Sequence, residues 1–357
     1  MLKRRERRAP MLGAIDNIRL MAVPYIGILA IFRAFWFSSL HPAGMKPRMP
    51  KLFVFALSAL SFMPLTSWAG PLRSSDVPEN VAWFAHVDCD ALRDNALGKF
   101  MLAEMNKPDN QSKLAVVTAI IDVDFRTQIH GLTLYAQTDF PKQPVLIVYG
   151  EFDTNRLITL AKGANEYEST QHEQHTIHSW LDQKRKMPDG SPAHVYAALP
   201  GTNMIIFGPR EKAVADVLDV LDNKAANLSN NKSYSQILKS SEPGTFLQAV
   251  GRKLDLPPAA ADLASHARLQ VRESNEELIA QFGIGSRSEA VATNMLSIAQ
   301  GITGLIKLQE KRPAVAKLAE KATLKQDGAE VLLTIVAPSE QVIEMLKFVL
   351  AKKLGAH

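Results

Sequence analysis

Downstream of residue 80, short apolar runs of strand type alternate with stretches in which apolar residues recur at helical spacing. In the first half of the chain, the strand pattern covers residues 81–87, 132–135, 145–152, 167–181, 193–199 and 204–207, and the helical pattern covers 92–101, 114–121, 154–164 and 210–221. Strand pairs this short cannot bury both of their faces alone. The pattern therefore predicts an antiparallel sheet with helices packed against it.

The second half of the chain restates this order in a shorter form. Strand patterns cover residues 245–250, 267–272 and 278–284 and a hairpin around Asp327 and Gly328, and helical patterns cover 288–310, a stretch after Pro313, and 339–354. The two endings match, because 205–211 and 334–340 both run from a strand through a proline into a helix with an early Glu. We therefore expect an α+β fold of two related units, each an antiparallel sheet with helices packed on one face.

Composition along the chain suggests where these units begin and end. Residues 224–244 are rich in Asn, Ser and Lys and carry few apolar side chains, which is typical of a linker with a short docking helix. We expect this linker to separate a first α+β unit at 70–223 from a second unit at 245–357.

Residues 45–69 have the three parts of a secretory signal peptide. A basic start precedes an uncharged apolar run that is too short to span a membrane, and Ser67 and Ala69 then supply the small side chains that a signal peptidase accepts. We expect cleavage after Ala69 and a periplasmic or extracellular mature protein, with an uncleaved membrane anchor as the alternative. Residues 1–44 are then an over-extended start or an N-terminal membrane segment, because 20–40 is apolar apart from Arg33.

The net positive charge of the chain comes from the leader, residues 1–69, and not from the rest of the sequence. The formal net charge is +5, from 41 Lys and Arg against 36 Asp and Glu. Residues 1–69 contain ten of these basic residues and two of the acidic ones, so the remaining chain has 31 basic and 34 acidic residues. A slightly acidic body argues against nucleic-acid binding. The single cysteine, Cys89, rules out a disulfide framework and suits an exported protein.

The most conspicuous candidate for chemistry is the histidine group His172, His175 and His178. On a straight strand, His172 and His178 share a face and His175 points the other way, so only a helix or a tight hairpin brings the three together. If they converge, they are candidate zinc ligands. The alternative is a polar, exposed hairpin, and no other cofactor is expected.

Other motifs give little support for catalysis. Cys89 stands between Asp88 and Asp90, whose charges oppose thiolate formation, so we expect a buried structural cysteine. Asp90 is the expected N-cap of the helix that follows, and the pair Asp122 and Asp124 suits a helix end as well as acid–base chemistry. Gly283-Ile284-Gly285 resembles the opening of a dinucleotide fingerprint, but a turn from strand to helix explains it more simply.

Residues 290–306 form a helical stretch without a single charged residue. Its expected apolar stripe consists of Val291, Met295, Ile298, Ile302 and Leu305. Asn294, Ser297 and Gln300 argue against a membrane span. We expect a core helix, with a partner-binding helix as the alternative.

The stretch Val-Pro-Glu-Asn-Val-Ala-Trp-x-x-His-Val-Asp at 77–88 resembles the start of exported bacterial proteins of unknown function that continue with repeated strand-pair and helix units. This resemblance implies the duplicated layout and no activity. We expect an exported, non-catalytic binding or scaffold protein for an unknown protein or small ligand of the cell envelope. The alternative is a metal-dependent hydrolase that uses His172, His175 or His178.

Overall fold

The computed structural model describes residues 70–138, 144–186, 192–238, 242–252, 263–308 and 319–354. The first half contains η1 (Ser74–Asp76), β1 (Trp83–Asp88), α4 (Cys89–Asp94), α5 (Ala96–Met105), α6 (Pro108–Ile121), β2 (Ile129–Ala136), β3 (Val145–Gly150), α7 (Thr154–Lys162), β4 (Glu168–His172), β5 (His175–Lys186), β6 (Pro192–Gly201), β7 (Met204–Gly208) and α8 (Glu211–Leu221). Then follow η2 (Leu228–Asn230), α9 (Lys232–Leu238), β8 (Thr245–Gly251), β9 (Ala264–Ser274), β10 (Glu277–Ser286), α11 (Glu289–Lys307), β11 (Ala322–Asp327), β12 (Glu330–Pro338) and α13 (Ser339–Leu354). Residues 1–44, the expected signal peptide at 45–69 and the expected helix after Pro313 lie wholly or largely outside the described residues.

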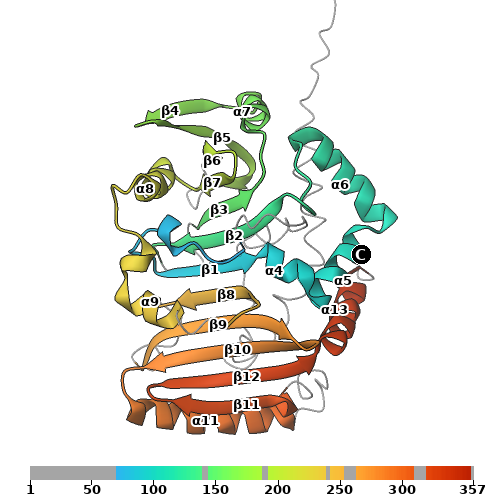
Figure 1. Ribbon diagram of the computed structural model, residues 1–357, viewed down its shortest axis with the longest axis vertical. Coiled ribbons are helices and arrows are strands. Elements are labelled where there is room, and N and C mark those ends of the chain that lie inside the picture. The colour runs from blue at the N-terminus through green and yellow to red at the C-terminus, as the bar shows by residue number, and fades with distance from the viewer. Residues whose placement is uncertain are drawn as a thin grey trace, which may run out of the picture.

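The described strands form one continuous antiparallel sheet (Figure 1). The α+β class expected from the sequence is confirmed. The two halves do not form separate sheets, because β1 and β8 pair with each other, with Trp83 opposite Gly251 and Val87 opposite Leu247. The strand ladder therefore runs unbroken from β4 at one edge to β11 at the other.

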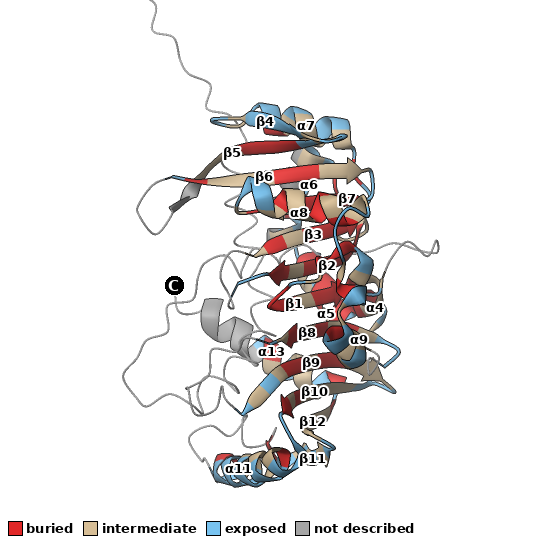
Figure 2. Ribbon diagram, turned by 90° about the vertical axis from the view of Figure 1, so that its left-hand side faces the viewer, coloured by how far each residue is buried: buried red, intermediate tan, exposed pale blue. Residues whose placement is uncertain are grey.

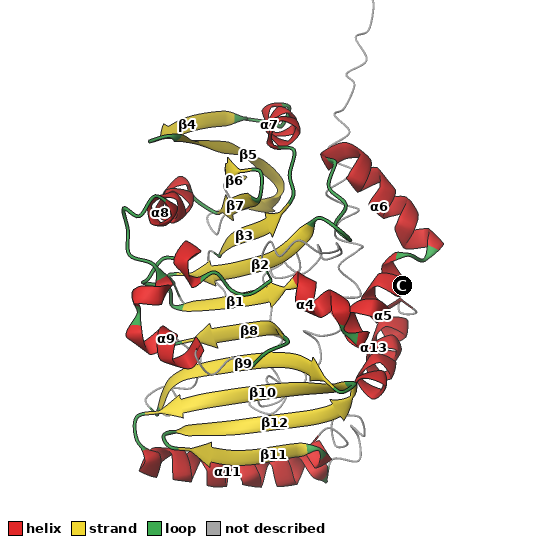
Figure 3. Ribbon diagram, in the orientation of Figure 1, coloured by secondary structure: helices red, strands yellow, loops and turns green. Residues whose placement is uncertain are grey.

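The strands follow the same succession outward from the central pair in both directions. One direction runs β1, β2, β3, β7, β6, and the other runs β8, β9, β10, β12, β11, after which β5 and β4 extend the first half alone (Figure 3). The final helices differ in their packing, because α8 and α13 contact different hydrophobic clusters. Strand order is thus shared between the halves, whereas helix placement is not.

The sheet has an apolar core on each of its faces. On one, which we call the α5 face, Val87, Leu132, Val148 and Ile205 pack with α4, α5, α6 and α13. On the other, the α8 face, neighbouring side chains of the same strands pack with α8, α9 and η2. We expected helices on one face only; both faces are covered because the central strands are apolar on both sides.

Side-chain caps define where several helices begin. The Asp88 carboxylate accepts a hydrogen bond from Ala91 N at 2.8 Å and caps α4, a role that the sequence suggested for Asp90. The cap lies two residues earlier because α4 begins directly after β1, without a turn between them. Asn95 caps α5 in the same way through Gly98 N. This close succession places polar side chains at the end of β1.

Candidate functional site

The histidine group lies on the β4–β5 hairpin, at the edge of the sheet that Figure 1 shows at the top. His172 and His175 are cross-strand partners. Nε2 of His172 lies 2.8 Å from Asp219 Oδ1, and Nε2 of His175 lies 3.0 Å from Asp222 Oδ1. The hydrogen bond from His175 is the main reason why the pKa of the Asp222 carboxyl is lowered. These two contacts fasten the tip of the hairpin to α8.

The third histidine does not join the other two. His178 follows His175 by an odd number of residues on β5, so the two side chains point to opposite faces. His178 is buried, its Nδ1 lies 2.9 Å from the Tyr167 hydroxyl, and burial lowers its pKa. Within the described ranges, no group of three or more His, Cys, Asp and Glu residues could hold a metal ion. The geometry therefore gives the predicted three-histidine metal site no support, and metal binding stays a prediction.

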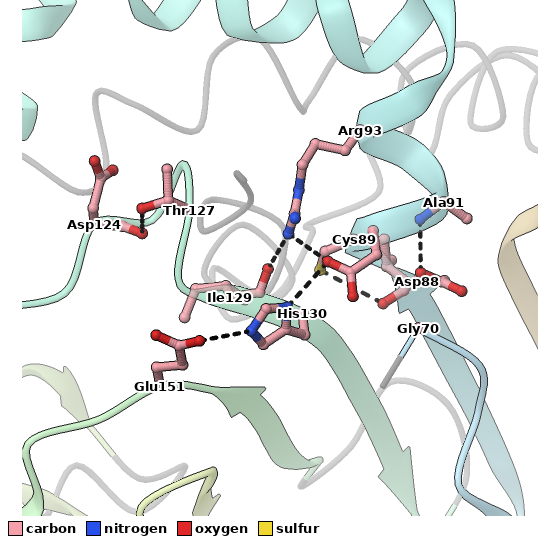
Figure 4. Close-up of polar contacts among 12 residues, drawn as sticks. Gly70, Asp88, Cys89, Ala91, Arg93, Asp124, Thr127, Ile129, His130 and Glu151 are labelled. Atoms are coloured by element: carbon pink, nitrogen blue, oxygen red, sulfur yellow. Dashed lines mark hydrogen bonds and ion pairs between the residues drawn. The ribbon is translucent and has the colours of Figure 1, made fainter. Parts of the chain in front are cut away.

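A second polar cluster, which the sequence did not indicate, joins α4 to β2 (Figure 4). Arg93 Nη2 lies 2.6 Å from Asp90 Oδ1 and 2.8 Å from the Ile129 carbonyl oxygen. Nδ1 of His130 lies 3.1 Å from the same Asp90 oxygen, and its Nε2 lies 3.8 Å from Glu151 Oε1. Arg93 and His130 are both buried, so this network fixes the first helix to the sheet.

The thiol beside this cluster is no nucleophile. Cys89 is buried, as the sequence predicted, and its Sγ lies 3.7 Å from the Val87 carbonyl oxygen. Burial raises the pKa of Cys89 well above its ordinary value, which leaves the thiol protonated. One sequence signal could have revealed the cluster: His130 is a titratable residue inside a strand at 129–136 whose other residues are uncharged and mostly apolar.

The remaining sequence candidates have structural roles. Asp122 ends α6 with a left-handed backbone, at φ 57°, and Asp124 forms an ion pair with Arg126 at 3.0 Å. Gly283 and Gly285 lie inside β10 rather than in the expected turn to the next helix. A Cβ at Gly283 would clash with Glu330 Oε1 and lie 3.0 Å from Arg268 Cγ, so the glycine makes room for these two side chains and the phosphate interpretation gains no support.

The outward side of α11 is an exposed apolar surface. The exposed fractions of its side chains are 60% for Ile298, 36% for Ile302, 67% for Leu305 and 77% for Leu308. Figure 2 shows α11 at the lower end of the sheet. The inner side of α11 packs on β10, β11 and β12. Ala292 and Ile306, near the two ends of the helix, are its buried residues. Three residues of the stripe that we expected in the core therefore face outward.

The described residues contain no helix with the length and hydropathy to cross a membrane. For α11 the shortfall is one of hydropathy, because its 19 residues include several polar side chains.

Comparisons with known proteins give a distant structural likeness. No protein-family model matches this chain, and no curated protein does. Crystal form I of a protein called TP0453 aligns with a TM-score of 0.40 and 10% identity, covering 79% of this chain and 98% of that one. Crystal form III aligns at 0.42 and 10%, covering 76% and 96%, and form IV at 0.42 and 9%, covering 78% and 98%. A likeness this distant carries no statement about function.

Proposed function

We propose that this chain is an exported, non-catalytic binding protein and that a partner protein docks on the outward side of α11. The observation that carries this proposal is the exposure of Ile298, Ile302, Leu305 and Leu308. The apolar stripe of a surface helix normally faces the core of its own protein. Contiguous apolar side chains at a surface mark a contact site.

The charge pattern of α11 favours a protein over a lipid surface as the partner. Helices that lie on membranes carry Lys and Arg along their polar side. Between Glu289 and Lys307, α11 carries no charged residue, and its exposed polar groups are uncharged ones such as Asn294 and Ser297. The centres of protein interfaces are depleted in charge in the same way. We therefore propose that the partner of α11 is another protein, which contacts the helix through an uncharged, apolar surface.

A non-catalytic role is consistent with the polar clusters described above. His172 and His175 fasten a hairpin to α8, and Arg93 and His130 fasten α4 to the sheet. Each of these three histidines has a structural partner. Export is supported by the leader, with its basic start, short apolar run and small residues before Gly70.

We further propose that the chain arose by duplication of a strand and helix unit. The shared strand order outward from β1 and β8 supports this proposal, as does the matched sequence pattern at 205–211 and 334–340. Superposition of 81–223 on 245–354 tests it, and a different path of the chain through the two sets of strands would contradict it.

The docking proposal is tested by site-specific photo-crosslinking in intact cells. A crosslinking residue at position 302 should give one discrete adduct with a different protein. Ile298→Asp combined with Leu305→Asp should abolish the adduct, because two buried charges disrupt an apolar interface. Ser297→Asp, on the same helix but at the margin of the apolar surface, is the matched control and should retain it.

Two other occupants of the surface have their own signatures in the same experiment. An adduct of twice the chain mass, together with a dimer in light scattering, would show self-association instead. Flotation of the purified protein with vesicles of zwitterionic and anionic lipid, lost in the double variant, would show a membrane surface. Either result, or the absence of any adduct, contradicts a partner protein. N-terminal sequencing of the exported protein tests cleavage separately.

A further inference from the structure

Gly70, the residue that follows the expected cleavage site, is held at the end of β1 (Figure 4). Its carbonyl oxygen lies 3.0 Å from Nε2 of His86, and Nδ1 of that ring lies 2.8 Å from the Thr133 hydroxyl. Because a carbonyl can only accept, Nε2 carries the proton and Nδ1 accepts from Thr133. His86 and Thr133 are buried in the sheet, so their hydrogen bonds fix the position of the Gly70 carbonyl.

The Asp88 carboxylate fills the space beside the Gly70 Cα. A Cβ at Gly70 would lie 2.7 Å from Asp88 Cγ and nearer still to its two oxygens, so the carboxylate occupies the place that a side chain would take. The carboxylate is therefore within about 4 Å of the Gly70 Cα, given ordinary bond lengths. A larger residue here would have to displace the Asp88 carboxylate, and Gly70 is the residue at which the expected cleavage starts the mature chain.

Among the described residues, Arg93 is the cation that acts on Asp88, and its influence is weak. The pKa of Asp88 is raised to about 6, and burial is the largest cause. The hydrogen bond from the Ala91 backbone N–H acts to lower this pKa, whereas the negative charge of Asp90 raises it further. Arg93 lowers the pKa only as the weakest influence, because its guanidinium is engaged by Asp90 and the Ile129 carbonyl. A positive charge beside Asp88 would relieve the cost of keeping this carboxylate buried and ionised.

We propose that cleavage after Ala69 creates a new N-terminal ammonium at Gly70 and that this ammonium forms an ion pair with the Asp88 carboxylate. The inference rests on the proposed cleavage site. A signal-peptidase-type endopeptidase adds water across the Ala69–Gly70 amide: Ala69 leaves as a carboxylate, and the Gly70 nitrogen takes up a proton. Asp88, His86 and Thr133 then form the binding site of the mature N-terminus.

Processing thereby changes the charge next to Asp88. In the uncleaved chain, the Gly70 nitrogen is a neutral amide and supplies no charge. After cleavage it is a cation, bonded directly to the Gly70 Cα that lies beside the carboxylate. The mature protein is thus stabilised by the cleavage that releases it from its leader.

The test compares two forms of the mature protein at residues 70–357. One begins with a free Gly70 amine, and the other is acetylated at Gly70, which restores the neutral amide. Carbon-13 NMR of labelled aspartate follows the titration of Asp88. Its pKa should lie about one to three pH units lower in the form with the free amine than in the acetylated form. The thermal midpoint at pH 7 should be higher with the free amine.

Asp88→Asn provides the decisive variant, because asparagine caps a helix as well as aspartate and α4 should remain folded. It should abolish the difference in thermal midpoint between the free and acetylated forms. Asp94→Asn, an exposed position on the same helix, should leave that difference intact. Equal Asp88 pKa values in the two forms, or a difference that survives in Asp88→Asn, would overturn the ion pair.

Cleavage is measured independently of pairing. If the exported protein begins at a residue other than Gly70, the cleavage proposal fails, and the inference fails with it. If it begins at Gly70 and the NMR titration shows no change, the cleavage proposal stands and only the ion pair is overturned.

Discussion

Arg268 on β9 and Glu330 on β12 form a two-point ion pair across the intervening strand β10. Nε to Oε1 is 2.6 Å and Nη2 to Oε2 is 3.1 Å. The guanidinium passes directly over Gly283, where any side chain would obstruct it. The pair therefore links β9 and β12, two strands that are not neighbours, in the part of the sheet that runs from β8 to β11.

We predict that Glu330→Gln lowers the free energy of unfolding at pH 7 by about 3 kcal/mol, because it leaves the buried Arg268 charge without its carboxylate. Urea titration measures this. Burial acts to raise the pKa of Glu330, but hydrogen bonds from His266 and Arg268 prevail and lower it. Its stabilisation is therefore present above the ordinary glutamate range and is lost as pH falls through the lowered pKa.

In Glu330→Gln, the free energy of unfolding should therefore fall less steeply with decreasing pH in the acid range than it does in the parent protein. Glu277→Gln, at an exposed position on β10, is the control and should change stability by no more than about 0.5 kcal/mol. Loss of equal size in both variants would contradict a specific role for the Arg268 pair.

Local sequence patterns predicted most elements of the fold. The apolar run at 81–87 became β1, and the uncharged stretch at 290–306 became most of α11, because the length and spacing of apolar runs favour one type of element locally. Pairing between β1 and β8 was not predictable. Strand partners far apart in the chain leave no local signal, so the merging of two expected sheets into one had to come from the structure.

The polar contacts were predictable only where they were local. His172 and His175 face one another because a hairpin joins them, which their spacing allowed. The link from Asp90 to His130 spans 40 residues and depends on how α4 crosses β2. A lone histidine in an apolar strand signals a buried polar contact but does not identify its partner.

His86 should make the protein sensitive to acid. Burial lowers its pKa to about 4, although the hydrogen bond to Gly70 acts in the opposite direction. The unfolded chain binds a proton near pH 6.5 and the folded one does not, so stability falls as pH drops from about 6.5 towards 4. The loss amounts to about 3 kcal/mol at most.

His86→Gln should remove this component, so that its stability changes less than that of the parent protein between pH 6.5 and 4.5. His194→Gln, at a partly exposed histidine, should leave the pH dependence as it was. Thermal midpoints measured across this range by circular dichroism provide the comparison, and parallel curves for His86→Gln and the parent would refute the assignment.

The histidine hairpin should not retain zinc. His178 lies on the other face from His175, and His172 and His175 are each engaged by a separate aspartate. We expect less than stoichiometric zinc after dialysis of the mature protein, measured by elemental analysis. One retained zinc per chain, lost in His172→Ala with His175→Ala but kept in His178→Ala, would support the hydrolase alternative instead.

The two sides of α11 should respond differently to the same change. Ile298→Asp, at an exposed position, should alter the free energy of unfolding by no more than about 0.5 kcal/mol. Ala292→Asp should cost several kcal/mol, because it buries an unpaired charge against the sheet. Urea denaturation of both variants checks this, and equal losses would mean that the outward surface is already covered within the chain.

The two halves of the sheet should unfold as one unit, because β1 and β8 share a ladder at its centre. The only tryptophans beyond the leader are Trp83 and Trp180, both in the first half, so their fluorescence reports on that half alone. Ala249→Pro removes a backbone donor from β8, in the second half, at a cost of about 3 kcal/mol or more. Because β1 is the neighbour of β8, we expect the variant to lower the urea midpoint of tryptophan fluorescence and that of far-ultraviolet circular dichroism together. Fluorescence that keeps the parent midpoint while circular dichroism shifts would mean that the halves fold independently despite their shared sheet.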